Sequence, residues 1–69
     1  MTRFDGQKLR ELRLAAGIRT EQLALDVERT NDTIRAYEMG KAKPTVGLLC
    51  RLADRLDVPV GELFASDAP

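Results

Sequence analysis

The chain of 69 residues lacks most of the residue types on which catalysis and metal binding depend. It has no histidine, its only serine is Ser66 and its only cysteine is Cys50. No Ser-His-Asp arrangement is possible, and a single thiol cannot complete a zinc site within one chain. Neither a phosphate-cradling glycine loop nor a calcium-binding Asp-x-Asp-x-Asp loop is present. We therefore expect no catalysis, no metal, no cofactor and no small-molecule ligand.

Aromatic residues, disulfides and long apolar runs are equally scarce. Phe4, Tyr37 and Phe64 are the only aromatic residues, so the core must be built mainly from leucine and other aliphatic side chains. One cysteine excludes an intrachain disulfide, whereas small secreted domains usually contain several. No apolar run approaches the ~20 residues that span a bilayer, and the first residues lack the apolar stretch of a signal peptide. These features favour a single cytoplasmic domain without membrane contact.

An excess of positive charge is also missing. Eleven Lys and Arg balance eleven Asp and Glu, and the isoelectric point is about 6.2. Nucleic-acid-binding domains are usually basic. The charges are unevenly distributed, however. From Asp54 onward the sequence contains four acidic residues and a single basic residue, Arg55. This distribution is compatible with a basic working face and a neutral or acidic rear.

The spacing of apolar residues predicts an all-α domain, a compact bundle of five short helices. Leu9, Leu12 and Ala16 recur at helical intervals, and comparable stripes follow along the chain. The expected helices lie at about 4–16, 20–27, 31–38, 45–56 and 60–64. No alternating pattern predicts a strand. We expect one domain over residues 1–64 and a flexible tail over residues 65–69.

Polar residues and glycines mark the expected helix boundaries. Either Thr2 or Asp5 is suited to cap the first helix, and Thr30 the third. Gly17 ends the first helix at a position that favours a left-handed backbone, and Gly40 ends the third.

Several short features then occur in one order along the chain. They are an Arg four residues before the first helix-ending glycine (Arg13, Gly17), Leu23-Ala24, Thr33-Ile34, Glu38-x-Gly40, Pro44, and the ending Leu56, Val58, Val60, Glu62, Leu63 and Phe64. Each feature alone is weak, but in this order they make residues 8–64 resemble the phage-repressor type of helix-turn-helix family, also called Cro/cI-like or XRE.

The resemblance implies a lambda-repressor-like fold in which the second and third helices form the DNA-reading unit. The helix at about 31–38 would then be the recognition helix that enters the major groove. The resemblance also implies a partly buried ion pair between Arg13 and Glu38. An Arg on an otherwise apolar stripe needs such a partner, because unpaired buried charge is costly.

The sequence departs from the family pattern at four positions. Glu28 replaces the usual glycine between the second and third helices, and must adopt a positive φ at a cost of about 1 kcal/mol or bend the turn differently. Arg29 follows where an apolar residue is usual. Arg19 occupies the usual capping position of the second helix, which shifts the expected cap to Thr20. Asp57 replaces a glycine after the fourth helix.

Base contacts are expected from the outer face of the recognition helix, at Asn31, Asp32, Arg35 and Ala36. Asn31 can pair with adenine through two hydrogen bonds, and Arg35 with guanine O6 and N7. Asp32 can accept from cytosine or orient Arg35, and Ala36 can touch a thymine methyl group. The alternative for the polar residues is an ordinary solvated first turn.

Phosphate contacts are expected from residues that flank this helix. The candidates are Arg19, Thr20, Gln22, Thr30, Lys41 and Lys43. The threonines also have a capping role, and the lysines are alternatively a solvated loop.

Taken together, the sequence predicts a sequence-specific DNA-binding transcriptional regulator that is not an enzyme. We expect a repressor that reads a pseudo-palindromic operator on double-stranded DNA as a homodimer. Leu56, Val58, Val60 and Phe64 are the candidate dimer surface, unless they close the monomer core. The alternatives are an antitoxin, a phage switch or a restriction-modification controller with the same chemistry, or a protein-interaction module without DNA binding.

Overall fold

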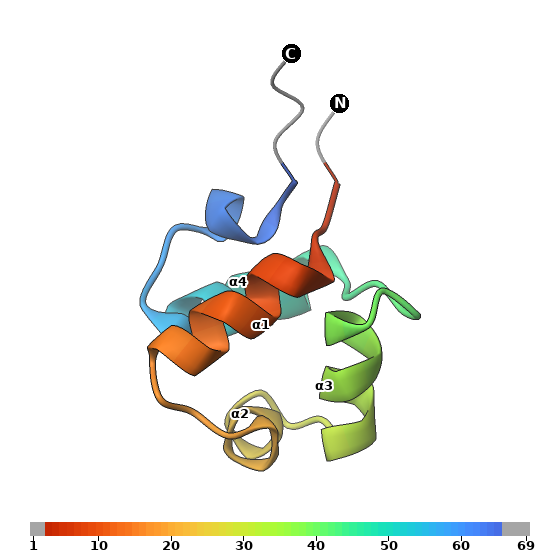
Figure 1. Ribbon diagram of the computed structural model, residues 1–69, viewed down its shortest axis with the longest axis vertical. Coiled ribbons are helices and arrows are strands. Elements are labelled where there is room, and N and C mark those ends of the chain that lie inside the picture. Colours follow the sequence, from red (N-terminus) through yellow and green to blue (C-terminus); the bar gives the residue numbers. More distant parts are fainter. Residues whose placement is uncertain (1–2, 66–69) are drawn as a thin grey trace.

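A computed structural model describes residues 3–65 as four α-helices followed by a 3-10 helix (Figure 1). These are α1 (Gly6–Ala15), α2 (Thr20–Asp26), α3 (Asn31–Glu38), α4 (Val46–Leu56) and η1 (Val60–Leu63). The prediction of an all-α chain is confirmed at this level. The fifth expected helix is instead a 3-10 helix of four residues.

The 3-10 helix is short because the chain leaves it to pair with the N-terminal segment. Phe64 has an extended backbone and forms an isolated antiparallel bridge with Phe4. The amide of Ala65 donates to the carbonyl of Arg3 at 2.7 Å, so this first residue of the expected tail is bonded to the N-terminal segment. Residues 66–69 of that tail, and the candidate cap Thr2, lie outside the described residues.

Side chains cap three of the four α-helices. Asp5 accepts from two amides in the first turn of α1, and Thr30 and Thr45 each accept from one amide in α3 and α4. The expected capping of α2 by Thr20 is wrong. Its N-cap is Arg19, which makes no side-chain capping bond, and the Thr20 hydroxyl instead bonds the adjacent Glu21 carboxylate at 3.2 Å.

Four positions use a left-handed backbone where helices end. Gly17 and Gly40 have φ values of 71° and 75° after α1 and α3. Glu28 and Asp57 have φ values of 59° and 58° at the two places where glycine is usual in the resembling family. The chain therefore keeps the same turns without glycine, and the conformation is less favourable for Glu28 than for Asp57, because aspartate adopts it more readily than most side chains.

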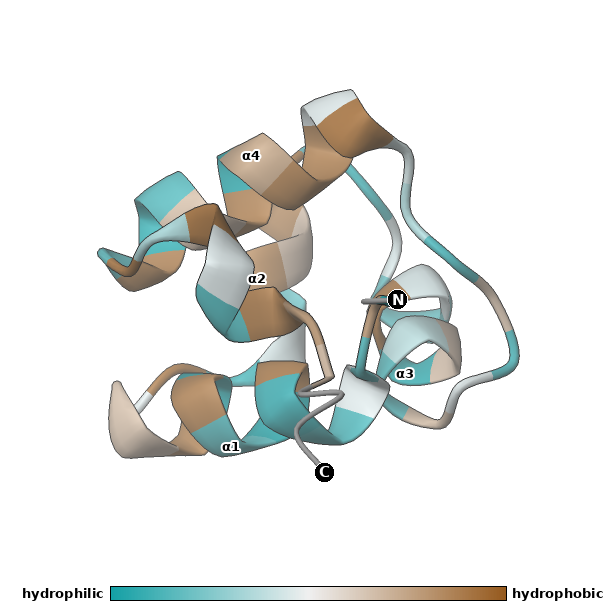
Figure 2. Ribbon diagram, turned by 90° about the horizontal axis from the view of Figure 1, so that it is seen from above, coloured by the Kyte–Doolittle hydropathy of each residue, from teal (hydrophilic) through white to brown (hydrophobic). Residues whose placement is uncertain are grey.

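One aliphatic core lies between the helices, and Figure 2 shows α4 as the most hydrophobic of them. Every helix contributes to this core. Its largest fully buried side chains are Leu9, Leu23, Val27, Ile34, Leu52 and Leu63. None of the helices within residues 3–65 has the length and apolarity needed to cross a bilayer.

The expected dimer surface is only partly accessible. Leu56 is buried, Val58 and Phe64 are half-buried against the core, and Val60 is 38% exposed. Leu56 therefore belongs to the monomer core, whereas the other three residues keep part of their surface in solvent.

A close approach between α1 and α3 was not anticipated from the sequence. A Cβ atom on Gly6 would lie 2.0 Å from the carbonyl oxygen of Tyr37 and 2.9 Å from that of Glu38. The first turn of α1 therefore rests directly on the last turn of α3. Glycine is required at position 6 because there is no room for a Cβ atom, and not because of its backbone angles. The position of α3 relative to α1 therefore depends on Gly6.

Candidate nucleic-acid interface

Helices α2 and α3 form a compact helix-turn-helix unit with α3 at the edge of the molecule (Figure 1). The turn between them closes through a hydrogen bond of 2.8 Å from the amide of Arg29 to the carbonyl of Ala24. Val27 is 1% exposed and anchors the turn in the core. Glu28 has a left-handed backbone and reverses the chain between Val27 and Arg29. This turn fixes α3 with one face outward.

The expected base-reading residues lie on that outward face. Asp32 and Arg35 are exposed, whereas Asn31 and Ala36 are half-buried. Ile34, on the opposite face, is fully buried. The exposed face is the geometry that entry into a DNA groove requires.

Asn31 differs from the expectation in detail. Its Oδ1 atom is buried and has no hydrogen-bond partner. Pairing with adenine requires both the oxygen and the nitrogen of the amide at the base edge. In this orientation the side chain must turn outward to pair in that way. An unpartnered buried oxygen is itself unfavourable by about 1–3 kcal/mol, which favours such a turn when a base is present.

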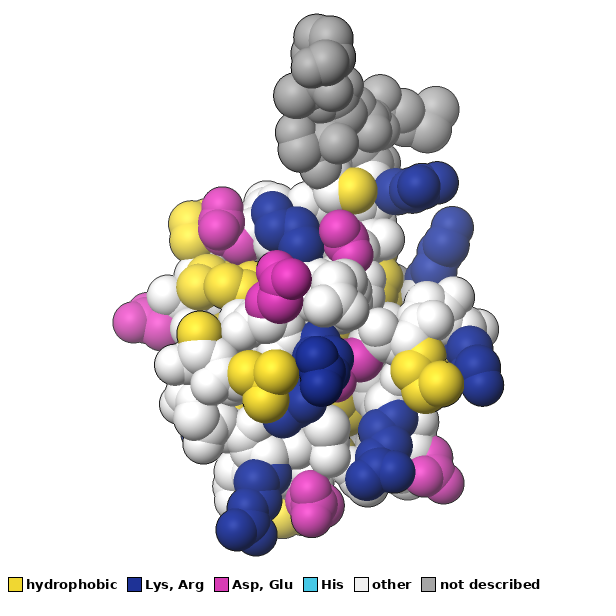
Figure 3. Space-filling model, in the orientation of Figure 1, with side chains coloured by type: hydrophobic (Ala, Val, Ile, Leu, Met, Phe, Trp, Pro, Cys, Tyr) yellow, Lys and Arg dark blue, Asp and Glu magenta, His cyan; other side chains and the backbone are white. Residues whose placement is uncertain are grey.

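The expected phosphate-contacting residues surround the reading helix and are accessible. Thr20 is half-buried, and the exposed members are Arg19, Gln22, Thr30, Lys41 and Lys43. Figure 3 shows Lys and Arg side chains along the edge formed by α3 and the loop that follows it. Thus a molecule without net charge presents a basic edge beside its reading helix.

Ion pairs at the back of the unit engage two of its acidic residues. Glu28 accepts from Arg51 at 2.7 Å, and Asp26 accepts from Arg55. The hydrogen bond from Arg55 lowers the pKa of Asp26 below its usual value. Both pairs tie the end of α2 and the turn to α4, so these two carboxylates are engaged by arginines of α4.

Glu21 is an acidic neighbour of the reading face that the sequence did not reveal. Its own backbone amide, followed by the Thr20 hydroxyl, lowers the pKa of the Glu21 carboxyl, and the nearby charges of Arg19 and Arg35 lower it further. Glu21 on α2 therefore lies within electrostatic reach of Arg35 on α3. No spacing rule predicts this proximity, because the angle between the two helices sets it.

The structure contains the Arg13–Glu38 ion pair that the family resemblance implies. Two nitrogens of the guanidinium contact both carboxylate oxygens, at 2.6 and 3.1 Å. The two side chains are only 9% and 6% exposed. Arg13 also donates to the carbonyl of Ile18 at 2.8 Å. The pair thus ties α1 to the last residue of the reading helix.

The arrangement defines a class: a small helical domain with the DNA-binding helix-turn-helix fold. Residues 6–65 match the profile of a family described as a helix-turn-helix domain. The chain therefore belongs to this family, and its residue pattern is of the phage-repressor (Cro/cI-like, XRE) type.

A sequence relative is an uncharacterized HTH-type transcriptional regulator of Rickettsia prowazekii (strain Madrid E). It is 36% identical over 61 residues, which cover 88% of this chain and 47% of the relative. The chain thus spans about half the length of the curated relatives that it matches.

Two solved structures have the same fold. The restriction-modification controller protein C.AhdI from Aeromonas hydrophila is 36% identical, with a TM-score of 0.81 over 86% of this chain and 89% of that protein. The P22 c2 repressor, solved with a synthetic operator, is 24% identical with a TM-score of 0.81 over 88% and 92% of the two chains. The latter likeness is one of fold alone.

Proposed function

We propose that this domain binds double-stranded DNA sequence-specifically, with α3 in the major groove, and that it regulates transcription. The observation that carries the proposal is the outward face of α3, where Asp32 and Arg35 are exposed beside a basic loop. The reading face supplies contacts to base edges, and the loop supplies contacts to phosphates. The match to the helix-turn-helix family supports the same use of this face.

Within this role, Arg35 is the principal base reader. Its guanidinium is always charged and suits the two acceptors of guanine in the major groove. Asn31 reads adenine after turning its amide outward, Asp32 accepts from cytosine, and Ala36 leaves room for a thymine methyl group. Phosphates are held by Arg19, Thr20, Gln22, Thr30, Lys41 and Lys43.

More specifically, we propose that the domain regulates transcription as a repressor that binds its operator as a homodimer. A single module buries about 600–1,000 Å² on DNA, which is little for tight specific binding, so two modules on a pseudo-palindrome are favoured. An operator that overlaps a promoter would then be blocked when the dimer is bound.

A second candidate role is control of a restriction-modification system. The likeness to C.AhdI favours it, since both chains are covered almost completely at 36% identity. A methylase gene beside the coding sequence would support this role, and its absence would favour the general repressor.

The test of DNA binding is selection of bound duplexes from a random pool, followed by a salt titration on the selected sequence. We expect a motif with two-fold symmetry and an affinity that falls steeply with salt. The logarithm of the binding constant should fall with the logarithm of the salt concentration, with a slope (the salt slope) of about 0.9 for each phosphate contacted. Failure to bind any duplex at low salt would contradict the proposal and favour a protein-interaction module.

A further inference from the structure

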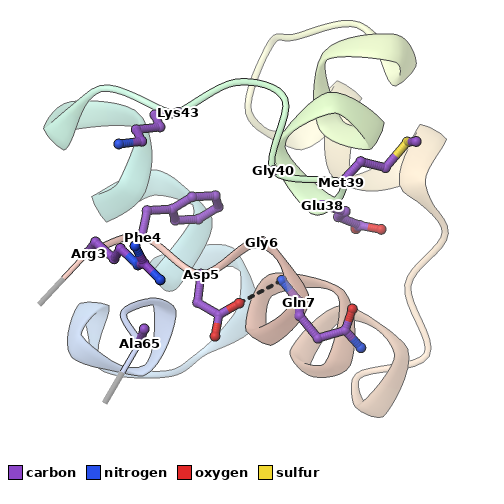
Figure 4. Close-up of a pocket in the computed structure, with 10 residues that line it drawn as sticks. All are labelled: Arg3, Phe4, Asp5, Gly6, Gln7, Glu38, Met39, Gly40, Lys43 and Ala65. Atoms are coloured by element: carbon purple, nitrogen blue, oxygen red, sulfur yellow. Dashed lines mark hydrogen bonds between the residues drawn. The ribbon is translucent and has the colours of Figure 1, made fainter. Parts of the chain in front are cut away.

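A hollow of about 530 Å³ opens beside the reading helix, between the N-terminal segment and the loop after α3. Figure 4 shows Arg3 and Lys43 on either side of Phe4 at one end of this hollow, with Glu38 and Met39 at the other. Arg3 comes from the start of the chain and Lys43 from the loop. The fold thus places two cations that are forty residues apart in the sequence on the lining of one hollow.

The segment that carries Arg3 is held in place on both sides. The carbonyl of Arg3 accepts from Ala65 at 2.7 Å, and the amide of Asp5 donates to Leu63 at 2.9 Å. Between them, the ring of Phe4 meets the ring of Tyr37 edge to face, with centroids 6.4 Å apart. The guanidinium of Arg3 therefore extends from a fixed backbone, and ordering it on a ligand costs only side-chain freedom.

The backbone of Lys43 is restricted by the residue that follows it. It precedes Pro44, which is buried and restricts the backbone of the residue before it. The Lys43 side chain itself is exposed. This part of the hollow thus has one accessible cation from the bonded N-terminal segment and another from the loop after α3.

The acidic residues of the hollow are already engaged elsewhere. Asp5 accepts from the amides of Gln7 and Lys8 at the start of α1. Glu38 is bound by Arg13 in the buried ion pair. Asp5 and Glu38 are half-buried, so the exposed charged side chains that line the hollow are the two cations, and an anion is the ligand that this end of the hollow suits.

We propose that Arg3 and Lys43 together hold one phosphate of the DNA backbone, beyond the edge of the reading helix. The proposal rests on the proposed function, because the loop that carries Lys43 is already placed at the DNA. It adds Arg3, which neither the sequence pattern nor the family match assigns, and it assigns both cations to the same phosphate. The N-terminal segment thereby lengthens the DNA footprint of the domain.

The experiment compares the salt dependence of DNA binding for Arg3→Gln, Lys43→Gln and the double variant on the selected duplex. Each single variant should lower the salt slope by much less than about 0.9, the value for one phosphate contact, because the remaining cation still neutralises the shared phosphate. The double variant should lower it by about 0.9, which is more than the two single losses added together, because only the loss of both cations leaves the phosphate without a partner. Arg10→Gln removes an exposed cation on α1 that does not line the hollow, and combined with Lys43→Gln it should change the slope far less than the double variant does.

A second measurement locates the phosphate. Single phosphates of the duplex are replaced in turn by neutral methylphosphonates, and the wild type is compared with Arg3→Gln. At one position on the flank of the site, the two proteins should bind equally well. Thermal melting followed by circular dichroism should be unchanged, since the exposed Arg3 side chain leaves its backbone bonds intact.

Three outcomes would overturn the proposal while leaving the proposed function standing. They are an unchanged slope for the double variant, a loss in the double variant no larger than the sum of the single losses, and no position at which a neutral linkage equalises the two proteins. Absence of binding by the wild type to every duplex is a different result, and it would instead contradict DNA binding itself.

Discussion

Side chains on and beside α3 divide into those that can carry sequence information and those that only hold the DNA. Arg35 is exposed on the reading face, and Lys43 lies in the loop after α3. An arginine can select guanine through two fixed hydrogen bonds, whereas a lysine on a phosphate contacts a group that every sequence shares. The same loss of one positive charge should therefore have different consequences at the two positions.

Arg35→Ala should weaken binding to the selected site by about 1–3 kcal/mol and relax the preference at one base pair. Lys43→Ala should weaken binding to selected and random duplexes alike and lower the salt slope. Both variants are to be measured by fluorescence anisotropy on the two kinds of duplex at several salt concentrations. Equal effects of both variants on selected and random DNA would contradict the assignment of Arg35 as a base reader.

Glu28 shows how a residue in an unfavourable conformation is accommodated. Its φ of 59° costs an ordinary side chain about 1–2 kcal/mol relative to a right-handed backbone. Its carboxylate bonds Arg51 on α4, but an exposed pair of this kind contributes only about 0.2–1 kcal/mol. The turn is therefore held mainly by the buried Val27 and the hydrogen bond that closes on Ala24.

The orientation of α3 depends on its contact with α1, and Gly6 tests this dependence. Gly6→Ala places a Cβ atom 2.0 Å from the Tyr37 carbonyl, so one of the two helices must move. We expect a loss of about 1–3 kcal/mol in the free energy of unfolding, as for other overpacked sites. DNA affinity should fall as well, because the reading helix is displaced.

Gly47→Ala is the matched control for this change. A Cβ atom at Gly47 meets nothing within 4 Å, and the residue lies in α4. Alanine is the better helix former there, so stability should rise by up to about 1 kcal/mol. Denaturant unfolding checks both variants, and a Gly6→Ala protein as stable as the control would contradict the close contact.

The ion pair between Asp26 of α2 and Arg55 of α4 predicts how the stability of the fold changes at acidic pH. The pKa of the Asp26 carboxyl is lowered in the folded protein, chiefly by its hydrogen bond from Arg55. Its contribution to stability is therefore fully present above about pH 3.8 and is lost as the pH falls through the folded pKa. Asp26→Asn should make the loss of stability below about pH 3.8 shallower.

This is measured from urea unfolding midpoints at a series of pH values. Asp54→Asn is the control, because Asp54 is an exposed carboxylate on α4 that makes no ion pair within residues 3–65. Parallel pH curves for wild type and Asp26→Asn would show that the Arg55 pair does not stabilise the fold.

At the scale of the molecule, the proposed homodimer constrains its DNA site. Two modules related by two-fold symmetry read half-sites whose centres are about 34 Å apart, one turn of the duplex. Insertion of five base pairs between the half-sites should turn one of them to the opposite face and reduce binding to that of a single module. Insertion of about ten base pairs should place both half-sites on one face again.

Gel-shift titrations on the three spacings, together with sedimentation of the free protein, check this arrangement. Since Leu56 is buried in the monomer core, a contact between subunits that uses the predicted set must rest on the exposed Val60 and the half-buried Val58 and Phe64. Binding that is indifferent to spacing would contradict a fixed dimer.

The sequence by itself determined the helices and their order. The spacing of leucines, the threonine caps and the glycines at positions 17 and 40 are local signals, and local signals fix where a helix begins and ends. They also identified the outward residues of α3, because burial of Ile34 forces its neighbours on the opposite face into solvent. The end of the chain was predicted less well, since the bridge between Phe4 and Phe64 joins segments sixty residues apart.

Only the tertiary structure decided which distant groups meet. The contact of Gly6 with α3, the proximity of Glu21 to Arg35, and the hollow shared by Arg3 and Lys43 all depend on the angles at which helices pack. Those angles follow from the shapes of side chains in one close-packed core, and periodicity along the chain does not contain them.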